Sequence, residues 1–419
     1  MARYNFEGNF KNLSDRQVEF INEVITKQNL NVNRVVFHPV GKADVNFMAD
    51  VKRISIEGNN GTMKMIVKIA SANENVRAFS LSEFLFGNEH VMYTEVLPKL
   101  VSLQKAAGVP KEEQLKFAKC YGSLNEAPNE VIILEDLNES SFKMLNKFES
   151  LSYECVKSIL KNFAILHSLS FVLKHQEPET YETYKEKLHN VWAIRANLHG
   201  VSQQFQGLEK LIMSTLDKEE HRNVVKNTVS CLPENILKAT KDWDNQYSII
   251  QQGDAWTNNI MFKFNDDELQ ESIMIDYQLS KVSNPVIDFL YMTLNCTDHE
   301  TRTKNFYNWL NYYYSELDKS LSYFGLKTAL VYPREQLDAD IKVYIKLLFS
   351  LSLVLANLLM RDTNEAVKVK EAMVDNGLEG VTTSMANQAV QTDTLLRTRK
   401  RIQDLINSLN ELGLLENGE

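Results

Sequence analysis

Two short apolar runs interrupt a long, mostly helical part of the sequence, and they constrain the fold more than any other feature. They lie in "YSIIQQGDAWTNNIMFKF" (247–264) and in "ESIMIDYQLS" (271–280), and both border polar loops. Short apolar runs bounded by turn-forming residues are typical of strands. We therefore expect a small hairpin embedded among helices, which is an α+β arrangement rather than an all-helical one.

The beginning of the chain predicts a small, mainly antiparallel sheet. Strand-like runs occupy 33–40, 45–57 and 62–70, and two more lie at 116–124 and 130–137. The "GNNG" between the second and third runs is a hairpin signal, because Asn and Gly tolerate positive φ. Helical periodicity is expected at 15–28, 82–107, 152–174 and 392–416.

A change of texture after Leu137 divides the chain into two expected lobes. Residues 1–137 form the sheet-rich lobe, and residues 138–419 form a larger, mostly helical lobe in which 362–391 is a polar surface excursion. Two lobes of different composition imply a cleft, and ligands prefer such clefts. We expect the two lobes to form one functional domain.

Composition excludes several classes of protein. The chain has 419 residues and a formal net charge of −9, which argues against a nucleic-acid-binding surface. The four cysteines are scattered and are expected to be reduced thiols. The most apolar run, 347–360, is too short to span a bilayer and is expected to be a buried core helix. The first residues lack the apolar stretch of a signal peptide, so the expected location is cytoplasmic.

Three polar residues on the predicted hairpin are candidates for chemistry. Asp254 and Asn259 share one loop, and Asp276 ends the following apolar run. Phosphoryl transfer needs a carboxylate that accepts the proton of the attacking hydroxyl, together with oxygen ligands for Mg²⁺. D-x-x-x-x-N also occurs by chance, but the flanking strands and Asp276 favour a functional role.

Lys68 and Glu89 are a second candidate group. Lys68 ends an apolar strand run, where it either points to solvent or holds phosphates as a point charge, and Glu89 on the next helix is placed to pair with it. Either residue alone is a weak signal. The chain order of Lys, Glu, the D-x-x-x-x-N loop and a further Asp matches the requirements of a kinase.

The sequence resembles the ecdysteroid kinase-like family, also called CHK kinase-like, whose members are related to choline and aminoglycoside kinases and have a two-lobed protein-kinase-like fold. The matching motifs run from about residue 30 to about residue 415. They are "MIVKIA", "FGNEHVMYTEVLP", "VIILEDL", "LKNFAILHSLSF", "QGDAWTNNIMF" and "IMIDYQLSKVSNPVIDFLYM". The last two motifs together are highly specific to this family.

The resemblance implies roles for individual residues. Lys68 would hold ATP phosphates, with Glu89 as its partner and Asn46 in the nucleotide loop. Glu135 and Leu137 would offer backbone groups to the adenine.

In the helical lobe, Asp254 would be the catalytic base, and Asn259 and Asp276 would bind Mg²⁺. Asp288 would either buttress the catalytic loop or cap a helix. His167 is expected to pack in the helical core.

The sequence departs from the family pattern at two places. Gln252 stands where the family usually has a histidine that anchors the catalytic loop, and we expect Gln252→His to leave activity equal or higher. In the nucleotide loop, the family's glycine and serine fall on Asp44 and Ala49, unless Gly41 takes the glycine's place. An Asp there would bring negative charge near the phosphates.

The resemblance implies an enzyme that uses ATP and Mg²⁺ to phosphorylate a hydroxyl of an ecdysteroid or another lipophilic or xenobiotic alcohol. The alternative is a pseudokinase that carries a lipophilic ligand with weak or no catalysis. The aromatic stretch 306–325 is either a wall of the acceptor pocket or part of the helical core, and the core is the favoured interpretation. The oligomeric state cannot be read from the sequence.

Overall fold

The computed structural model describes residues 4–40, 49–372, 374–375 and 392–415. These residues fall into two compact units. Unit 1 comprises the N-terminal 95 residues, 117–142 and 362–388, and unit 2 comprises 96–116, 143–361 and the C-terminal segment from residue 389. The predicted Asn46, together with Gly41 and Asp44, lies outside the described residues.

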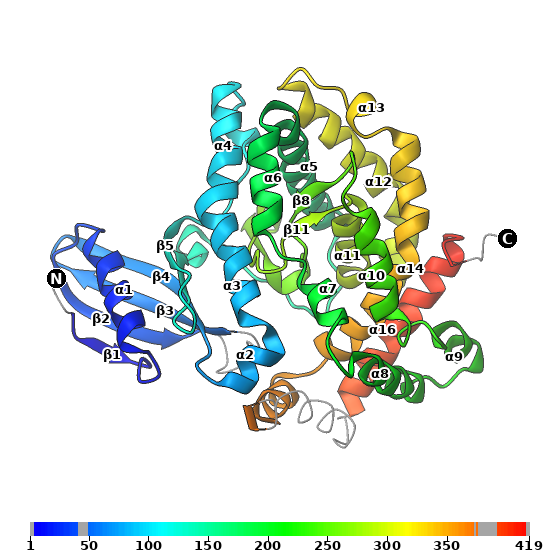
Figure 1. Cartoon of the computed structure of the whole chain (residues 1–419), viewed down its shortest axis with the longest axis horizontal. Helices are drawn as coiled ribbons and strands as arrows, with labels where there is room; N and C mark the ends of the chain where they lie inside the picture. Colours follow the sequence, from blue (N-terminus) through cyan, green and yellow to red (C-terminus); the bar gives the residue numbers. More distant parts are fainter. Residues whose placement is uncertain (1–3, 41–48, 373, 376–391, 416–419) are drawn as a thin grey trace. The chain divides into compact units, whose positions relative to one another are not determined.

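Unit 1 is built on a six-stranded sheet with the order β1-β2-β3-β4-β6-β5 (Figure 1). Only β1 and β2 pair in parallel among these strands. The elements are β1 (Phe6–Gly8), α1 (Asp15–Thr26), β2 (Val32–Pro39), β3 (Ala49–Gly58), β4 (Gly61–Ala70), α2 (Glu74–Ser80), α3 (Ser82–Val91), β5 (Cys120–Leu124), β6 (Val131–Glu135) and the 3-10 turn η3 (Leu137–Ser140). The "GNNG" hairpin is confirmed, and each predicted run contains a strand; residues 45–48 of the second run lie outside the described residues, and the strand in the fourth run begins only at Cys120.

Helix α1 covers one face of this sheet. Ser14 and Gln17 form a reciprocal capping box at its start. The apolar face of α1, with Ile21 and Val24, packs into one core cluster with Val67 and Ile69 of β4. Because side chains alternate along a strand, Lys68 lies on the opposite face of the sheet.

The helix predicted over 82–107 is confirmed, with one irregularity. The structure has α3, then a π-helical turn η1 (Met92–Val96), then α4 (Leu97–Ala106). Pro98 occupies the first turn of α4 and has no N–H to donate to the preceding turn. A local widening of the helix at this point is consistent with the missing hydrogen bond.

Unit 2 is mostly helical. Its elements besides α4 are η2 (Lys111–Glu113), α5 (Tyr153–Gln176), α6 (Pro178–Lys187), α7 (Val191–Ala196), α8 (Val201–Thr215), α9 (Glu219–Val225), α10 (Leu232–Asp242), β8 (Ile249–Gln251), η4 (Thr257–Asn259), β9 (Ile260–Asn265), β10 (Glu268–Met274), β11 (Lys281–Ser283), α11 (Val286–Cys296), α12 (His299–Ser322), α13 (Thr328–Val331), α14 (Arg334–Leu359) and α16 (Thr392–Glu411). At the short strand β7 (Phe142–Lys143) the chain passes from unit 1 into the longest segment of unit 2. The α+β fold class, with an N-terminal sheet and a mostly helical C-terminal part, is confirmed.

Long helices form the core of unit 2. α5 packs along α12, and α11 packs along α14. Phe306, Trp309 and Tyr313 of the aromatic stretch in α12 are buried, as the core interpretation expected.

α5 and α14 are long and apolar enough to cross a membrane by length and composition alone, but 78% and 72% of their most apolar windows are buried inside the protein. Such burial is typical of core helices.

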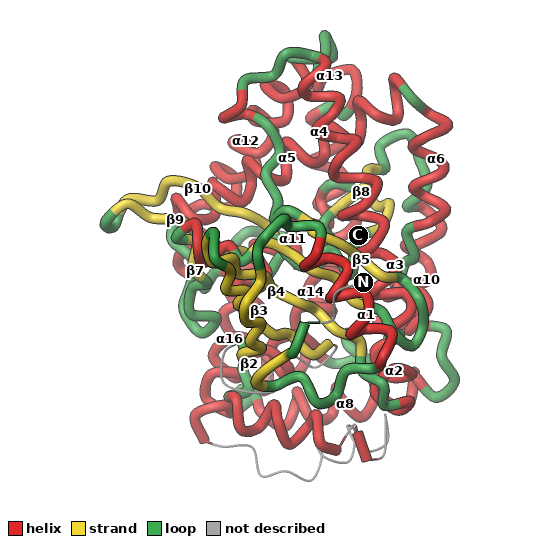
Figure 2. The backbone as a smooth tube through the Cα atoms, turned by 90° about the vertical axis from the view of Figure 1, so that its left-hand side faces the viewer, coloured by secondary structure: helices red, strands yellow, loops and turns green. Residues whose placement is uncertain are grey.

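The predicted hairpin is confirmed, and a second ladder accompanies it. β9 and β10 pair antiparallel and form the hairpin that Figure 2 shows in yellow. β8 and β11 form a separate two-stranded ladder, in which Gln251 lies opposite Lys281. The segment that carries Asp254 and Asn259 leaves β8 and enters β9, so the two ladders fix its ends. All four cysteines are free, as expected.

Candidate active site

The start of the candidate catalytic loop, Gln252–Asn259, is held in place by the carboxylate of Asp288. Asp288, in the first turn of α11, accepts hydrogen bonds from the backbone N–H groups of Gln252 and Gly253, both at 2.9 Å. It also accepts from His167 Nε2 at 3.1 Å. Asp288 therefore buttresses the loop rather than serving only as a helix cap.

His167 lies in the helical core, as expected. It is fully buried, stacks on Phe163, and has Tyr313 Oη at 2.9 Å from Nδ1. Because the Asp288 carboxylate can only accept, His167 Nε2 is the donor and Nδ1 accepts from Tyr313. His167 thus acts on the loop only through Asp288.

Gln252 anchors the loop with its whole side chain. Its Nε2 donates to the carbonyls of Ile275 and Asp276, both at 3.0 Å, and its Oε1 accepts from Asp254 N at 2.6 Å. Its own carbonyl accepts from Ser280 Oγ at 3.0 Å. These bonds tie the catalytic loop to the segment that carries Asp276.

Gly253 is required by both conformation and space. Its φ is +86°, and a Cβ at this position would lie 2.2 Å from the Leu279 carbonyl oxygen. Any larger residue would therefore push the loop away from the segment after Asp276.

The carboxylate of Asp254 is held in one orientation by two donors. Tyr291 Oη donates to Oδ1 at 2.5 Å, and Asn259 Nδ2 donates to Oδ2 at 2.9 Å. Burial and the neighbouring Asp254 carboxylate raise the pKa of Tyr291 well above its usual value, so Tyr291 remains a donor.

Asn259 and Asp276 are brought together by the β9–β10 hairpin. Ile275 N donates to the Asn259 carbonyl at 2.9 Å, which places Asp276 one residue beyond this contact. The Asn259 amide nitrogen is turned toward Asp254, so its Oδ1 is the atom left for a cation. Asp276 is partly exposed and has a φ of +62°, a left-handed conformation that Asp tolerates better than most residues.

These oxygens fit a Mg²⁺ site of the kind that kinases use, in which one or two protein oxygens hold the ion together with substrate phosphates. A cluster of three or more His, Cys, Asp or Glu side chains able to hold a metal by themselves is not found in the described part of the chain.

Unit 1 brings the predicted pair Lys68 and Glu89 together. Lys68 Nζ, on the interior strand β4, lies 2.5 Å from Glu89 Oε2 on α3. Both side chains are buried. A lysine held in this way has a fixed position, as phosphate binding by a point charge requires.

Glu135 and Leu137 lie at the end of β6 and at the start of η3. The Glu135 N–H donates to the Lys119 carbonyl at 2.8 Å, so this N–H is already used within unit 1. Between them, Asp136 is buried, accepts from Asn138 and pairs with Arg53, and these contacts hold its pKa below the usual value against the effect of burial. Ala49 begins β3 and is buried.

Sequence reasoning missed Tyr291. Asp288 and Tyr291 are three residues apart on α11, so they share a helix face, and both contact the catalytic loop. This spacing was visible in "IDFLYM", but only the fold shows that the face is turned toward Asp254.

A sequence model of the ecdysteroid kinase-like family matches residues 44–326, which is more than half of the chain and includes every candidate residue. The chain belongs to the ecdysteroid kinase-like family. It is therefore a member of a family of kinase-like phosphotransferases. No curated protein matches this chain.

Two solved structures are distantly similar to this chain. A spectinomycin phosphotransferase, in complex with ADP and spectinomycin, is 10% identical with a TM-score of 0.43, covering 90% of this chain and 97% of that one. An ethanolamine kinase from Plasmodium vivax is 11% identical with a TM-score of 0.39, covering 88% and 87%.

Proposed function

We propose that this protein is an ATP-dependent kinase that phosphorylates a hydroxyl group of a small lipophilic alcohol, such as an ecdysteroid or a xenobiotic. The observation that carries the proposal is the orientation of Asp254, whose two carboxylate oxygens are fixed by Tyr291 and Asn259 on a loop anchored by Asp288. A catalytic base must be held in this way to accept a proton from a bound hydroxyl.

In the proposed reaction, Asp254 accepts the proton of the acceptor hydroxyl. The hydroxyl oxygen forms a bond to the γ-phosphorus of ATP, the bond from that phosphorus to the β–γ bridging oxygen breaks, and ADP leaves. Lys68, fixed by Glu89, would hold ATP phosphates. Asn259 and Asp276 would hold Mg²⁺, which neutralises charge on the phosphates when bound.

The alternative is a pseudokinase that carries a lipophilic ligand. It is motivated by Gln252 and by Ala49, where the family usually has histidine and serine. The hydrogen bonds of the Gln252 side chain weaken the first part of this argument, because the loop is anchored without an imidazole.

Calorimetric titration with ATP, with and without Mg²⁺, separates the two functions. We expect Mg²⁺-dependent binding that is lost in Asp276→Ala and retained in Asp267→Ala, which removes an exposed charge from the tip of the same hairpin. Asp254→Asn should bind ATP like the wild type but lose roughly 10²–10⁴-fold in turnover. ATP-independent binding of a lipophile, with no binding of millimolar ATP, would support the pseudokinase instead.

A further inference from the structure

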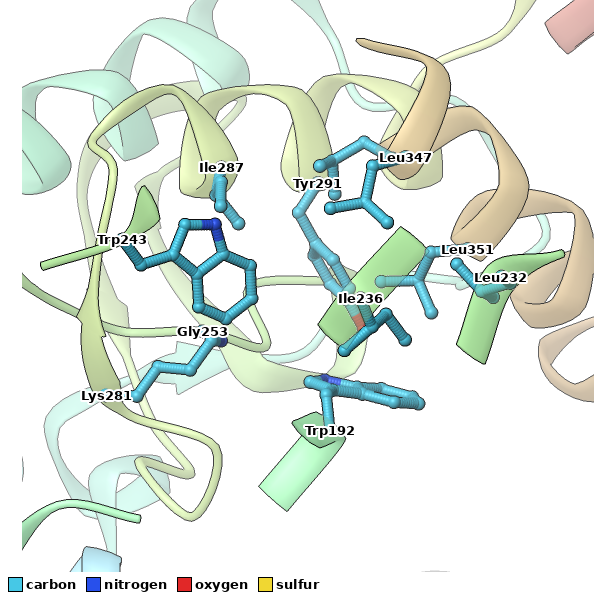
Figure 3. Close-up of a pocket in the computed structure, with 11 residues that line it drawn as sticks. Trp192, Leu232, Ile236, Trp243, Gly253, Lys281, Ile287, Tyr291, Leu347 and Leu351 are labelled. Carbon is cyan, nitrogen blue, oxygen red and sulfur yellow. The ribbon is translucent and has the colours of Figure 1, made fainter. Parts of the chain in front are cut away.

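An apolar pocket lies inside unit 2, next to the catalytic loop (Figure 3). The indoles of Trp192 and Trp243 and aliphatic side chains of α10, α11 and α14 form most of its wall, and Gly253, Lys281 and Tyr291 complete it. Gly253 is the residue before Asp254, and Tyr291 donates to the Asp254 carboxylate. The pocket therefore borders the candidate catalytic base on two sides.

Lys281 is the exceptional residue of this pocket. Its side chain is only 3% exposed and runs beside the Trp243 indole toward Gly253 (Figure 3). Nζ lies 5.5 Å from the centre of the Trp243 ring, and no hydrogen bond or ion pair to Nζ is found within the described residues. Most buried ammonium groups have such a partner, because an uncompensated buried charge is costly.

Trp243 also carries a buried donor, Nε1, which has no acceptor in the part of the chain that the structure describes. It is turned toward Ile287 and away from Lys281 (Figure 3). The pocket thus offers one positive charge, and its other walls are almost entirely apolar. A ligand that completes it must present acceptor oxygens and an apolar body, and an ammonium-bearing ligand would be repelled by Lys281.

We propose that this pocket binds one end of an apolar molecule that carries an anionic oxygen group, such as a carboxylate, with that group at Lys281 Nζ. Burial lowers the pKa of Lys281 to about 8, while Asp288 and Asp254 act in the opposite direction, so the amine still carries a proton at neutral pH. The pocket has a volume of about 30 Å³, so it admits one end of the ligand and the rest lies outside.

This inference rests on the proposed function in one respect. If the protein is a kinase, the bound molecule is its acceptor, and the preferred substrates are hydroxy acids rather than neutral or cationic alcohols. The position of Gly253 in both the pocket wall and the catalytic loop connects the two statements.

Three ligands with the same chain test the chemistry of recognition: octanoate, 1-octanol and octylammonium. Each is titrated into the full-length protein without nucleotide, and tryptophan fluorescence is followed, since two of the four tryptophans line the pocket. We expect octanoate to bind about tenfold more tightly than 1-octanol, because the anion gains a charge-assisted hydrogen bond, and octylammonium to bind most weakly.

Lys281→Met should reduce the octanoate-to-octanol preference to about one, while Lys241→Met, an exposed lysine at the end of α10, should preserve it. Leu351→Trp should weaken all three ligands by filling the pocket with Lys281 intact. Equal binding of octanoate and 1-octanol by the wild type, or an unchanged preference in Lys281→Met, would overturn the inference. Circular dichroism checks that each variant is folded.

The acceptor role is tested separately with Mg²⁺, ATP and either 8-hydroxyoctanoate or 1,8-octanediol. Faster transfer to the hydroxy acid, lost in Lys281→Met, supports the inference. Equal transfer to both compounds overturns it and leaves the proposed kinase function standing. A Lys281-dependent octanoate preference without any ATP binding would reject the kinase function and keep the binding site.

Discussion

Two buried lysines show how differently the two units treat the same charged group. Lys68, in the sheet of unit 1, has the Glu89 carboxylate 2.5 Å from its Nζ. Lys281, in the β8–β11 ladder of unit 2, lies against an indole and aliphatic side chains instead. Both are at least nine-tenths buried.

The protein compensates the charge of Lys68 with a carboxylate, but it places an indole beside the charge of Lys281. Glu89 fixes Lys68 in place, so the charge of Lys68 is compensated within unit 1. Lys281 lacks such a carboxylate partner among the described residues, and its lowered pKa records the cost of burial. Glu89 therefore holds Lys68 in one position, whereas Lys281 has no carboxylate at ion-pair distance among the described residues.

Removing the partner of Lys68 should have the largest effect. Glu89→Ala leaves a buried ammonium without its carboxylate, and we expect a loss of about 3 kcal/mol in the free energy of unfolding. Urea unfolding measures it. The double variant Lys68→Met/Glu89→Leu should recover much of the loss, because it removes both charges.

The matched control is Glu234→Ala, which breaks the Lys238–Glu234 pair on the surface of α10 and should leave the free energy of unfolding almost unchanged. A double variant as unstable as Glu89→Ala would show that the pair does not explain the loss.

Lys281→Met should raise the free energy of unfolding, whereas Glu89→Ala lowers it. Between pH 8 and 10.5 the unfolded chain keeps this proton while the native protein has lost it, so wild-type stability gains from rising pH. Below about pH 8 the burial penalty is fully present, and the variant should be more stable than the wild type by about 2 kcal/mol.

This advantage should shrink as the pH rises toward 10.5. The measurement is the difference in unfolding free energy between variant and wild type at pH 7, 8 and 9, because the titration of groups that do not contact Lys281 cancels in it. A difference that does not change with pH would contradict the assignment.

Tyr291 lies between the pocket of Lys281 and the candidate base, and its hydroxyl is expected to matter moderately. Tyr291→Phe removes one donor from Asp254, while Asn259 still holds the other oxygen. We expect about 1 kcal/mol lower stability and a several-fold lower kcat with little change in KM.

The pH profile of kcat distinguishes positioning from packing. Activity falls at low pH when the catalytic base is protonated, and this acidic limb should shift only if Tyr291 acts on Asp254. Tyr307→Phe, at an exposed position of α12, is the control. An unshifted profile with unchanged kcat would remove Tyr291 from the site.

Gln252→His should have the smallest effect, and its direction differs from the one that sequence alone suggests. The Gln252 amide donates twice through Nε2 and accepts through Oε1. A neutral imidazole has only one N–H, so it replaces only part of this set. We expect a loss of under 1 kcal/mol and equal or slightly lower turnover. A clear gain in activity would mean that ring shape matters more than hydrogen bonds.

The local elements and the residue types of the candidate site follow from short stretches of the sequence. The capping box at Ser14, the "GNNG" turn and the alternation that places Lys68 opposite the α1 face are written in neighbouring residues. The D-x-x-x-x-N spacing and the following hairpin brought Asp254, Asn259 and Asp276 into one segment. These features depend on short-range geometry, which periodicity and turn chemistry reveal.

The contacts that hold these residues in position depend on the tertiary fold. The pairing of Gln251 with Lys281 spans thirty positions of the chain, and the contact between His167 and Asp288 joins two helices that are far apart in sequence. Nothing local distinguishes Lys281 from an exposed lysine, or Tyr291 from a core tyrosine. Their roles follow from which faces pack together, because long-range packing fixes burial and hydrogen-bond partners after the local elements have formed.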